Sequence, residues 1–179
     1  MTLSLLNPQL TIYANDINPK RIKLLEDFRN QYDLAAVKPL VSDIKRISLK
    51  KDIDFIIVDA PCTSSGTLRK NPDLKIKINS DLVNKNADNQ YKIMESITSY
   101  FPGPVYILYS VCSFIKAETE DVLERLFNKA SLADRFEIID LTLLLEEYGF
   151  LFKKGSYGYY LLPSGTLNND LFYISLLKK

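Results

Sequence analysis

The segment IDFIIV at Ile53–Val58 is almost entirely apolar and runs directly into DAPC at Asp59–Cys62. A short apolar run without polar alternation is typical of a strand that is buried on both faces of a parallel sheet. In open sheets of this kind, ligands bind at the carboxyl ends of the strands. The acid and the cysteine that follow Ile53–Val58 therefore predict a functional rim at that end of the sheet.

Strands and helices alternate on either side of this segment. Further strands are predicted at Leu10–Ala14, Val37–Val41, Val105–Val111 and Leu171–Leu177, with a strand-like run at Phe136–Leu141. Helices are predicted from Pro19 onward with Asn18 as the cap, at Asp81–Phe101 and at Glu118–Lys129, while residues 63–80 read as a long loop and Gly149–Gly165 as a turn or hairpin. The alternation predicts an α/β fold built on an open parallel sheet.

The composition limits the classes of protein that the chain can represent. It has 179 residues, no histidine, two cysteines, and 23 Lys+Arg against 22 Asp+Glu. The near-equal numbers of basic and acidic residues exclude a basic nucleic-acid arm and an acidic disordered tail. The lack of histidine excludes catalytic triads and metal sites that use a histidine. Two cysteines are too few for a disulfide scaffold or a four-cysteine zinc site. No apolar run approaches the ~20 residues of a membrane span, and no signal peptide is recognisable, so we expect a reduced, cytoplasmic protein without a metal or a membrane partner.

Four predicted strands end at a residue that can do chemistry. These residues are Asp16, Asp43, Asp59 and Cys112. A single Asp at a strand end is often only the cap of the following helix. Reactive groups at four corresponding positions instead indicate a shared site along one rim.

Two cysteine-containing blocks then carry a family resemblance. Asp59–Asp73 (DAPCTSSGTLRKNPD) aligns without a gap with the DAPCSGTG…R..PD block of the RsmB/NOP (Sun) family of RNA cytosine-5 methyltransferases. Tyr109–Ser113 (YSVCS), followed by Glu118–Glu120 (ETE), resembles the YSTCS…ENE block of the same family. Gln90 and the closing segment Asn169–Tyr173 also match. The resemblance covers nearly the whole chain and implies a Rossmann-like, S-adenosylmethionine-dependent methyltransferase sheet, with residues 1–179 as a single, partial catalytic domain.

The resemblance implies methylation of carbon 5 of cytosine in tRNA or rRNA. Carbon 5 is a poor nucleophile, and a thiolate that adds to carbon 6 activates it. By resemblance Cys112 is this nucleophile, Cys62 acts in release of the adduct, and Asp59 binds the N3/N4 edge of the base. Arg69 and Lys70 are candidate phosphate contacts in the RNA.

The resemblance also implies how the cofactor S-adenosylmethionine is held. Asp16 matches the acid that binds the ribose hydroxyls, since a carboxylate can accept two hydrogen bonds from a diol. Asp43 matches the acid near the adenine, and Asp59 borders the same site. Arg21 matches a frequent family arginine, although an ordinary surface residue of a helix would explain it equally well.

Several residues have simpler explanations that the sequence leaves open. A free cysteine is often just a small buried hydrophobe, and Glu118–Glu120 is equally explained by charge complementarity at a helix start. Tyr157–Tyr160 indicates core or turn packing more than a base-stacking platform. For the whole chain, the alternatives are a non-catalytic RNA-binding or scaffold relative and, with less support, a thiol redox protein without C-x-x-C spacing.

One departure from the family concerns the start of the catalytic domain. The family begins it with a central strand and a PGGKT loop that approaches the cofactor, and nothing here matches that loop. Thr2–Asn7 resembles the tail of the helix that follows it, so we expect an N-terminally truncated domain. Either an upstream segment or a second chain would then complete the sheet, unless the protein is a degenerate relative. We expect this chain alone to bind the cofactor weakly and to be inactive.

Overall fold

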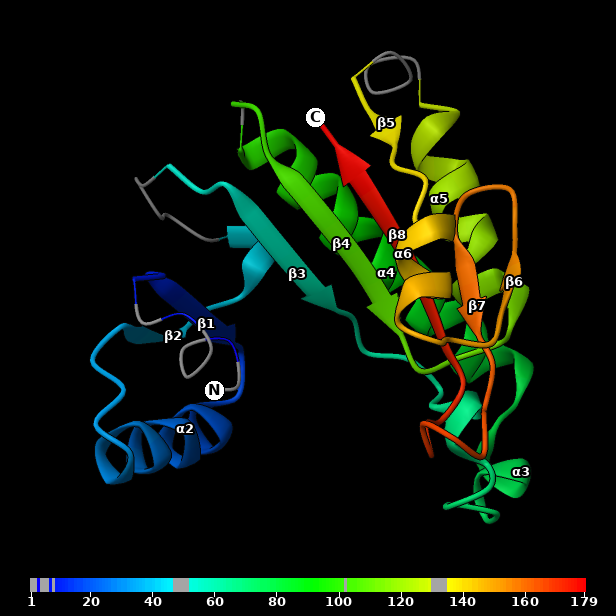
Figure 1. The fold of residues 1–179 in the computed structure, drawn as a ribbon, viewed down its shortest axis with the longest axis horizontal. Coiled ribbons are helices and arrows are strands. Elements are labelled where there is room, and N and C mark those ends of the chain that lie inside the picture. The colour runs from blue at the N-terminus through cyan, green and yellow to red at the C-terminus, as the bar shows by residue number, and fades with distance from the viewer. Residues whose placement is uncertain (1–2, 4–6, 8, 47–51, 102, 130–134) are drawn as a thin grey trace. The chain divides into compact units, whose positions relative to one another are not determined.

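The computed structural model describes residues 3, 7, 9–46, 52–101, 103–129 and 135–179 (Figure 1). They belong to two compact units, Met1–Lys50 and Lys51–Lys179. The expectation of a single domain over residues 1–179 stays a prediction. Most of the helix tail expected at Thr2–Asn7 lies outside the described residues.

The first unit is a β-α-β element. Strand β1 (Ile12–Asp16), helix α2 (Pro19–Gln31) and strand β2 (Val37–Val41) follow one another, and a 3-10 turn η1 (Ile44–Arg46) comes after them. The two strands pair in parallel, from Ile12 opposite Val37 to Asp16 opposite Val41. Helix α2 begins as predicted, with Pro19 in its first turn and the Asn18 side chain accepting a hydrogen bond from the Lys20 N–H at 2.9 Å.

The second unit contains a six-stranded mixed sheet. Its strands run in the order β3 (Phe55–Asp59), β4 (Tyr106–Val111), β8 (Phe172–Lys178), β7 (Tyr159–Leu161) and β6 (Phe152–Lys154), and β5 (Glu137–Ile138) also pairs with β8. The β3–β4 pair is parallel, as predicted, whereas β8 is antiparallel to β4. The expected strand over Phe136–Leu141 is reduced to β5, and the predicted hairpin region holds β6 and β7.

Four helices and two 3-10 turns complete this unit. They are η2 (Ser65–Thr67), α3 (Leu74–Lys77), α4 (Ser80–Tyr100), η3 (Lys116–Glu118), α5 (Glu120–Phe127) and α6 (Thr142–Glu147). The predicted loop over residues 63–80 is therefore wrong in part, because it contains η2 and the four-residue helix α3. Elements of three or four residues are too short to show a helical period in the sequence. The helix predicted from Glu118 begins at Glu120, since Thr119 has non-helical backbone angles of φ −124° and ψ −99°.

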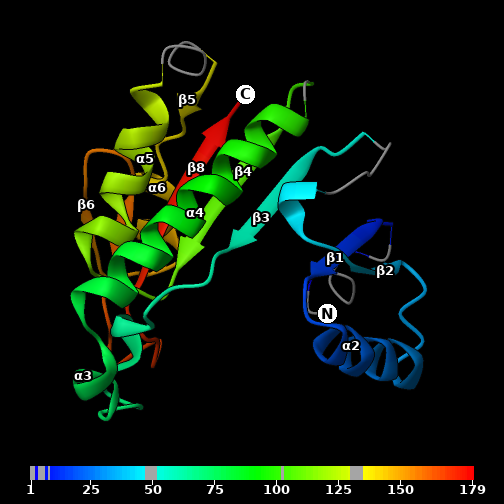
Figure 2. The same cartoon turned by 180° about the vertical axis from the view of Figure 1, so that it is seen from behind.

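The core is organised by strand alternation. Helices α4 and α5 lie against one face of the sheet (Figure 2), where Ile107, Tyr109 and Val111 of β4 are fully buried. Alternate residues of β8 face opposite sides of the sheet. Tyr173 is buried with this first core, whereas Ile174 packs with a second cluster around α6 and the β6–β7 hairpin.

The parallel β3–β4 pair sets the position of the candidate site. Asp59, at the carboxyl end of β3, is in register with Ser110 near the end of β4. The segments that follow the two strands therefore start from the same rim, and they carry Cys62 and Cys112. This arrangement confirms the prediction that Asp59 and Cys112 share one rim. Within the described residues, β3 is the outer strand of its sheet.

Gly66 fixes the Cys62 loop to its neighbours by close backbone contact. Its N–H donates to the Cys112 carbonyl at 3.0 Å, and its carbonyl accepts from the Leu171 N–H at 3.2 Å. A Cβ at this position would lie 2.1 Å from the Leu171 carbonyl oxygen. Only glycine allows this approach, because the obstructing atoms belong to the backbone.

Gly66→Ala should therefore lower the free energy of unfolding by roughly 1–3 kcal/mol, the range of overpacked sites. The matched control is Gly165→Ala, where an added Cβ meets no atom within 4 Å and the change should stay within about 0.5 kcal/mol. Urea unfolding of both variants measures the difference. Equal effects of the two substitutions would contradict the assigned contact.

Candidate active site

The two cysteines meet at the rim formed by β3 and β4. Their Sγ atoms lie 3.3 Å apart, and both thiols are free and partly buried. This separation exceeds the ~2.05 Å of a disulfide bond and allows a hydrogen bond between a thiol and a thiolate. The two cysteines are therefore neighbours without a disulfide bond.

This contact polarises the two cysteines in opposite directions. The hydrogen bond from Cys62 lowers the pKa of Cys112 to about 6, against the opposing effects of burial and of the nearby Asp59 charge. The same hydrogen bond, together with burial, raises the pKa of Cys62 far above its usual range. At neutral pH, Cys62 holds the proton and Cys112 is a thiolate, which is the nucleophilic form of cysteine.

Ser64 lies beside Cys112 in a backbone conformation that favours glycine. Its backbone is left-handed, with φ +58°, and the family usually has glycine at this position. The Ser64 Oγ lies 3.5 Å from the Cys112 Sγ, and this contact also lowers the pKa of Cys112, after the larger effect of Cys62. The substitution therefore keeps the loop geometry and adds a polar group next to the thiolate.

Glu118 and Glu120 are both buried and fully engaged. Glu118 accepts hydrogen bonds from the N–H and hydroxyl of Thr63 and from the Ser113 hydroxyl. Glu120 accepts hydrogen bonds from the Tyr173 hydroxyl and from the N–H groups of Ser156 and Tyr157. Charge complementarity at a helix start is therefore not a sufficient explanation of this pair. One feature of the sequence could have indicated that Glu118 is buried. It comes four residues before Val122, so the helical period places it on the same apolar side as Val122.

Helix α4 supports the Cys62 loop from behind through Gln90. The Gln90 side chain is fully buried, and its Nε2 donates to the Pro61 carbonyl at 2.8 Å. Its Oε1 is buried without a hydrogen-bond partner among the described residues. This contact fixes the backbone one residue before Cys62.

Asp59 differs from the other predicted acids in being open. It is exposed at the end of β3, and no hydrogen bond or ion pair joins its carboxylate to another described residue. Its charge acts on Cys112, whose pKa it raises against the stronger effect of Cys62. An open carboxylate next to the thiolate is placed to accept hydrogen bonds from a bound base.

The two candidate phosphate contacts are held by the segment before β8. Lys70 forms an ion pair with Asp170 at 2.7 Å, and Arg69 donates to the Asn168 side chain at 3.1 Å and lies 4.0 Å from Asp170. Both cations remain more than half exposed. Their assignment to RNA stays a prediction.

The remaining predicted cofactor residues belong to the first unit. Asp16 ends β1, and its carboxylate accepts from the Asn18 N–H at 2.7 Å and pairs with Arg21 at 3.0 Å. Asp43 follows β2 and accepts from the Lys45 N–H at 3.1 Å. Each acid thus also acts in a local turn, and its role toward a cofactor stays a prediction.

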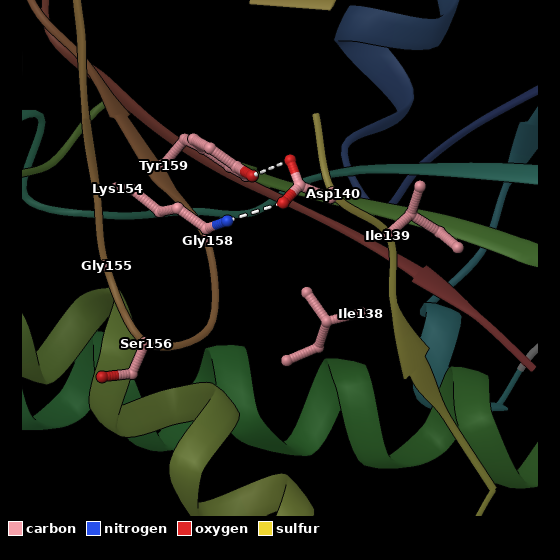
Figure 3. Close-up of a pocket in the computed structure, with 8 residues that line it drawn as sticks. All are labelled: Ile138, Ile139, Asp140, Lys154, Gly155, Ser156, Gly158 and Tyr159. Atoms are coloured by element: carbon pink, nitrogen blue, oxygen red, sulfur yellow. Dashed lines mark hydrogen bonds and ion pairs between the residues drawn. The ribbon is translucent and has the colours of Figure 1, made fainter. Parts of the chain in front are cut away.

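A small hollow of about 70 Å³ lies elsewhere in the second unit (Figure 3). It lies beside the β6–β7 hairpin, where Asp140 accepts from the Tyr159 hydroxyl at 2.8 Å and pairs with Lys154 at 2.6 Å. None of its lining residues belongs to the cysteine loops. Tyr159 is buried, which confirms packing as the role of this tyrosine of the Tyr157–Tyr160 segment.

No helix in the described part of the chain is both long enough and apolar enough to cross a bilayer.

The polarised cysteine pair predicts an asymmetric reaction with iodoacetamide. Because the pKa of Cys112 is lowered to about 6, Cys112 should be the first cysteine to be alkylated at pH 7, while Cys62 still holds its proton. Cys62→Ala removes the main stabilising donor, so the midpoint for Cys112 should move to higher pH. Peptide mass spectrometry over a pH series measures both effects. An unchanged Cys112 midpoint in Cys62→Ala would contradict the assigned coupling.

Comparison with known proteins places this site in a family. The profile of the family described as "16S rRNA methyltransferase RsmB/F" matches residues 1–178. A "Probable ribosomal RNA small subunit methyltransferase B" of Coxiella burnetii is 29% identical over an alignment of 179 positions, which covers 97% of this chain and 39% of that protein. A "tRNA (cytosine(34)-C(5))-methyltransferase" of Drosophila melanogaster is 34% identical over 123 residues, 69% of this chain and 15% of that protein.

A solved structure supports the same fold. NSun6 from Pyrococcus horikoshii, crystallised with SFG, superposes with a TM-score of 0.74 at 20% identity, covering 94% of this chain and 41% of that one. The likeness shows the Rossmann-like α/β fold. The chain thus spans about two-fifths of the length of the Coxiella relative, 39%. From the match over residues 1–178, we conclude that the chain belongs to the RsmB/F methyltransferase family.

Proposed function

We propose that this chain is the catalytic core of an S-adenosylmethionine-dependent enzyme that methylates carbon 5 of cytosine in rRNA or tRNA. The observation that carries the proposal is the 3.3 Å contact between two oppositely polarised cysteines. Relatives named as rRNA and tRNA methyltransferases support the substrate class. A reactive thiolate beside a second thiol and an open carboxylate fits covalent catalysis on a pyrimidine ring better than a purely structural role.

In the proposed reaction, the Cys112 thiolate forms a bond to carbon 6 of the cytosine. The π electron pair between carbon 5 and carbon 6 moves to the carbon 4–carbon 5 bond, and the negative charge builds up at N3. The resulting enamine makes carbon 5 nucleophilic. When bound, S-adenosylmethionine would supply the methyl group from its sulfonium centre, whose sulfur–methyl bond breaks to leave S-adenosylhomocysteine. The proton on carbon 5 must then leave, after which the sulfur–carbon bond breaks and Cys112 regains its electron pair.

Cys62 is the proposed participant in release. Its high pKa comes first from the hydrogen bond to Cys112 and then from burial. Once the Cys112 sulfur is bonded to the base, it is no longer a thiolate, and the largest cause of the high Cys62 pKa disappears. Cys62 therefore becomes easier to ionise at the stage when a base is needed for the carbon 5 proton.

Asp59 is the proposed contact for the N3/N4 edge of the base. An acceptor carboxylate matches the amino group at position 4, and a hydrogen bond at N3 would stabilise the charge that develops on the ring. The exposure of Asp59 at the end of β3 leaves it free for this contact. Arg69 and Lys70, both partly exposed, are proposed to neutralise RNA phosphates.

The acids of the first unit fit a cofactor with a ribose diol. Asp16 accepts one N–H and one guanidinium contact, and a carboxylate has lone pairs left for two hydroxyl groups. We assign Asp16 to the ribose side and Asp43 to the adenine side, with Arg21 as a further cofactor contact, as the family resemblance implies. An upstream segment or a second chain is proposed to complete the site, in a reducing cytoplasm that keeps both thiols free.

The roles of the two cysteines predict opposite outcomes for their alanine variants. Cys112→Ala should abolish methyl transfer and form no adduct, because attack is lost. Cys62→Ala should accumulate a covalent RNA adduct, because attack survives while release fails. A denaturing gel with cytosine-containing RNA and S-adenosylmethionine, using a form of the protein that binds both, shows the adduct.

Two outcomes of this gel would count against the proposal. An adduct with Cys112→Ala but not with Cys62→Ala would reverse the assignment of the cysteines. RNA and cofactor binding without methyl transfer or adduct in any form would favour a non-catalytic RNA-binding relative.

A further inference from the structure

Glu118 connects the two cysteine-bearing loops to each other. Its side chain is fully buried. The Oε1 atom accepts from the Thr63 N–H at 2.8 Å, and the Oε2 atom accepts from the hydroxyls of Thr63 and Ser113, each at 2.6 Å. Thr63 directly follows Cys62, and Ser113 directly follows Cys112. One carboxylate thus holds the residue next to each thiol.

The backbone of Glu118 is anchored to β4, the strand that directly precedes Cys112. The buried Tyr109 hydroxyl, from β4, donates to the Glu118 carbonyl at 2.8 Å. The loops are joined a second time by Ser65 and Ser113, whose hydroxyls lie 2.9 Å apart. Glu118 is therefore held at its backbone as well as at its carboxylate, and it cannot move without moving the thiols.

Burial of a carboxylate needs a physical explanation. A charge removed from water is costly unless nearby donors satisfy it. Glu118 receives three short hydrogen bonds, all from the two cysteine loops. An apolar side chain would fill the same space without this cost but would not join the loops. Only a side chain with the length and polar atoms of glutamate or glutamine can form this bridge between the loops.

We propose that Glu118 is a positioning residue that sets the distance between the Cys62 and Cys112 sulfur atoms. This inference rests on the proposed function for its catalytic meaning. Without the bridge, the contacts of Ser65 with Ser113 and of Gly66 with Cys112 still join the loops. Thr63 and Ser113, the residues that follow the two thiols, then lose the carboxylate that holds them both. The carboxylate also acts electrostatically on Cys62, whose high pKa arises first from Cys112, then from burial, and to a smaller extent from the Glu118 charge.

Phenylarsine oxide provides a probe of thiol separation that needs neither RNA nor cofactor. Its arsenic forms bonds to two thiols that lie together and releases one water molecule, so no oxidant is consumed. Capture by the full chain is followed by intact mass spectrometry. The variants compared are Glu118→Ala, which removes the bridge, and Glu118→Gln, whose amide can still contact Thr63 and Ser113 because hydroxyls can donate or accept.

Glu120→Ala is the matched control. Glu120 is nearly as buried, at 7% exposure, and also accepts three hydrogen bonds, but from Tyr173, Ser156 and Tyr157 instead of the cysteine loops. Glu120→Ala shows how far the loss of any buried carboxylate from this segment changes the rate of arsenical capture. Circular dichroism establishes that each variant is folded.

The rate of arsenical capture should fall about tenfold in Glu118→Ala, as expected for loss of a coupled contact, and stay within about threefold of the parent in Glu118→Gln. The Glu120→Ala control should capture at the parent rate. A parent rate in folded Glu118→Ala would overturn the proposal. If Glu118→Ala does not fold, Ser113→Ala decides, because it removes the hydrogen bond that the Ser113 hydroxyl of the Cys112 loop donates to Glu118. An unchanged rate in Ser113→Ala would also overturn the proposal.

Kinetics separate this inference from the proposed function. In an active form, Glu118→Ala should lower kcat by about 100-fold, as misplacement of a reacting group by ~1 Å can, with little change in KM for RNA and recovery in Glu118→Gln. Altered capture in a protein that never transfers methyl groups would retain the positioning role and reject the proposed function. Normal capture with normal kcat in Glu118→Ala would reject the positioning role alone.

Discussion

The parallel pairing of β3 with β4 is the constraint on which the candidate site depends. Parallel strands place their carboxyl ends at one edge, and the register that puts Asp59 opposite Ser110 starts both cysteine loops from the same place. Other elements of the second unit hold these two strands in place. Helices α4 and α5 cover one face (Figure 2), and the antiparallel β8 fixes the other edge of β4. Gly66 then lies between the loop after β4 and the segment before β8.

The chemistry of the site depends on two features of the cysteine loops, which are the proton on Cys62 and the buried charge of Glu118. Cys62 keeps the proton and stabilises the Cys112 thiolate across 3.3 Å. The Glu118 carboxylate contacts Thr63 and Ser113, the residues that directly follow the two cysteines, and among the described residues these two supply all its hydrogen bonds. A buried carboxylate and a thiolate are both costly on their own. Each is supported here by donors that the backbone geometry supplies.

The sequence predicted what depends on local pattern and missed what depends on distant partners. The apolar run before Asp59 was sufficient to predict β3, and the cap at Asn18 was sufficient to predict the start of α2. The positions of the strand ends were sufficient to predict that Asp59 and Cys112 lie on one rim. The antiparallel direction of β8 was not predictable, because it follows from the path of the intervening chain. The role of Glu118 depends on Thr63, which is 55 positions away in the sequence. The ion pair of Lys70 depends on Asp170, which is 100 positions away. No local pattern encodes such contacts.

The central claim is that Cys112, and not Cys62, bonds to the base. RNA that carries 5-fluorocytidine tests it directly, because fluorine cannot leave carbon 5 as a cation and the adduct of a covalent mechanism cannot be resolved. The unsubstituted protein, in a form that binds RNA and S-adenosylmethionine, should give a stable crosslink that peptide mapping locates at Cys112. A crosslink at Cys62, or methylation of ordinary RNA without any crosslink to the fluorinated one, would contradict the account.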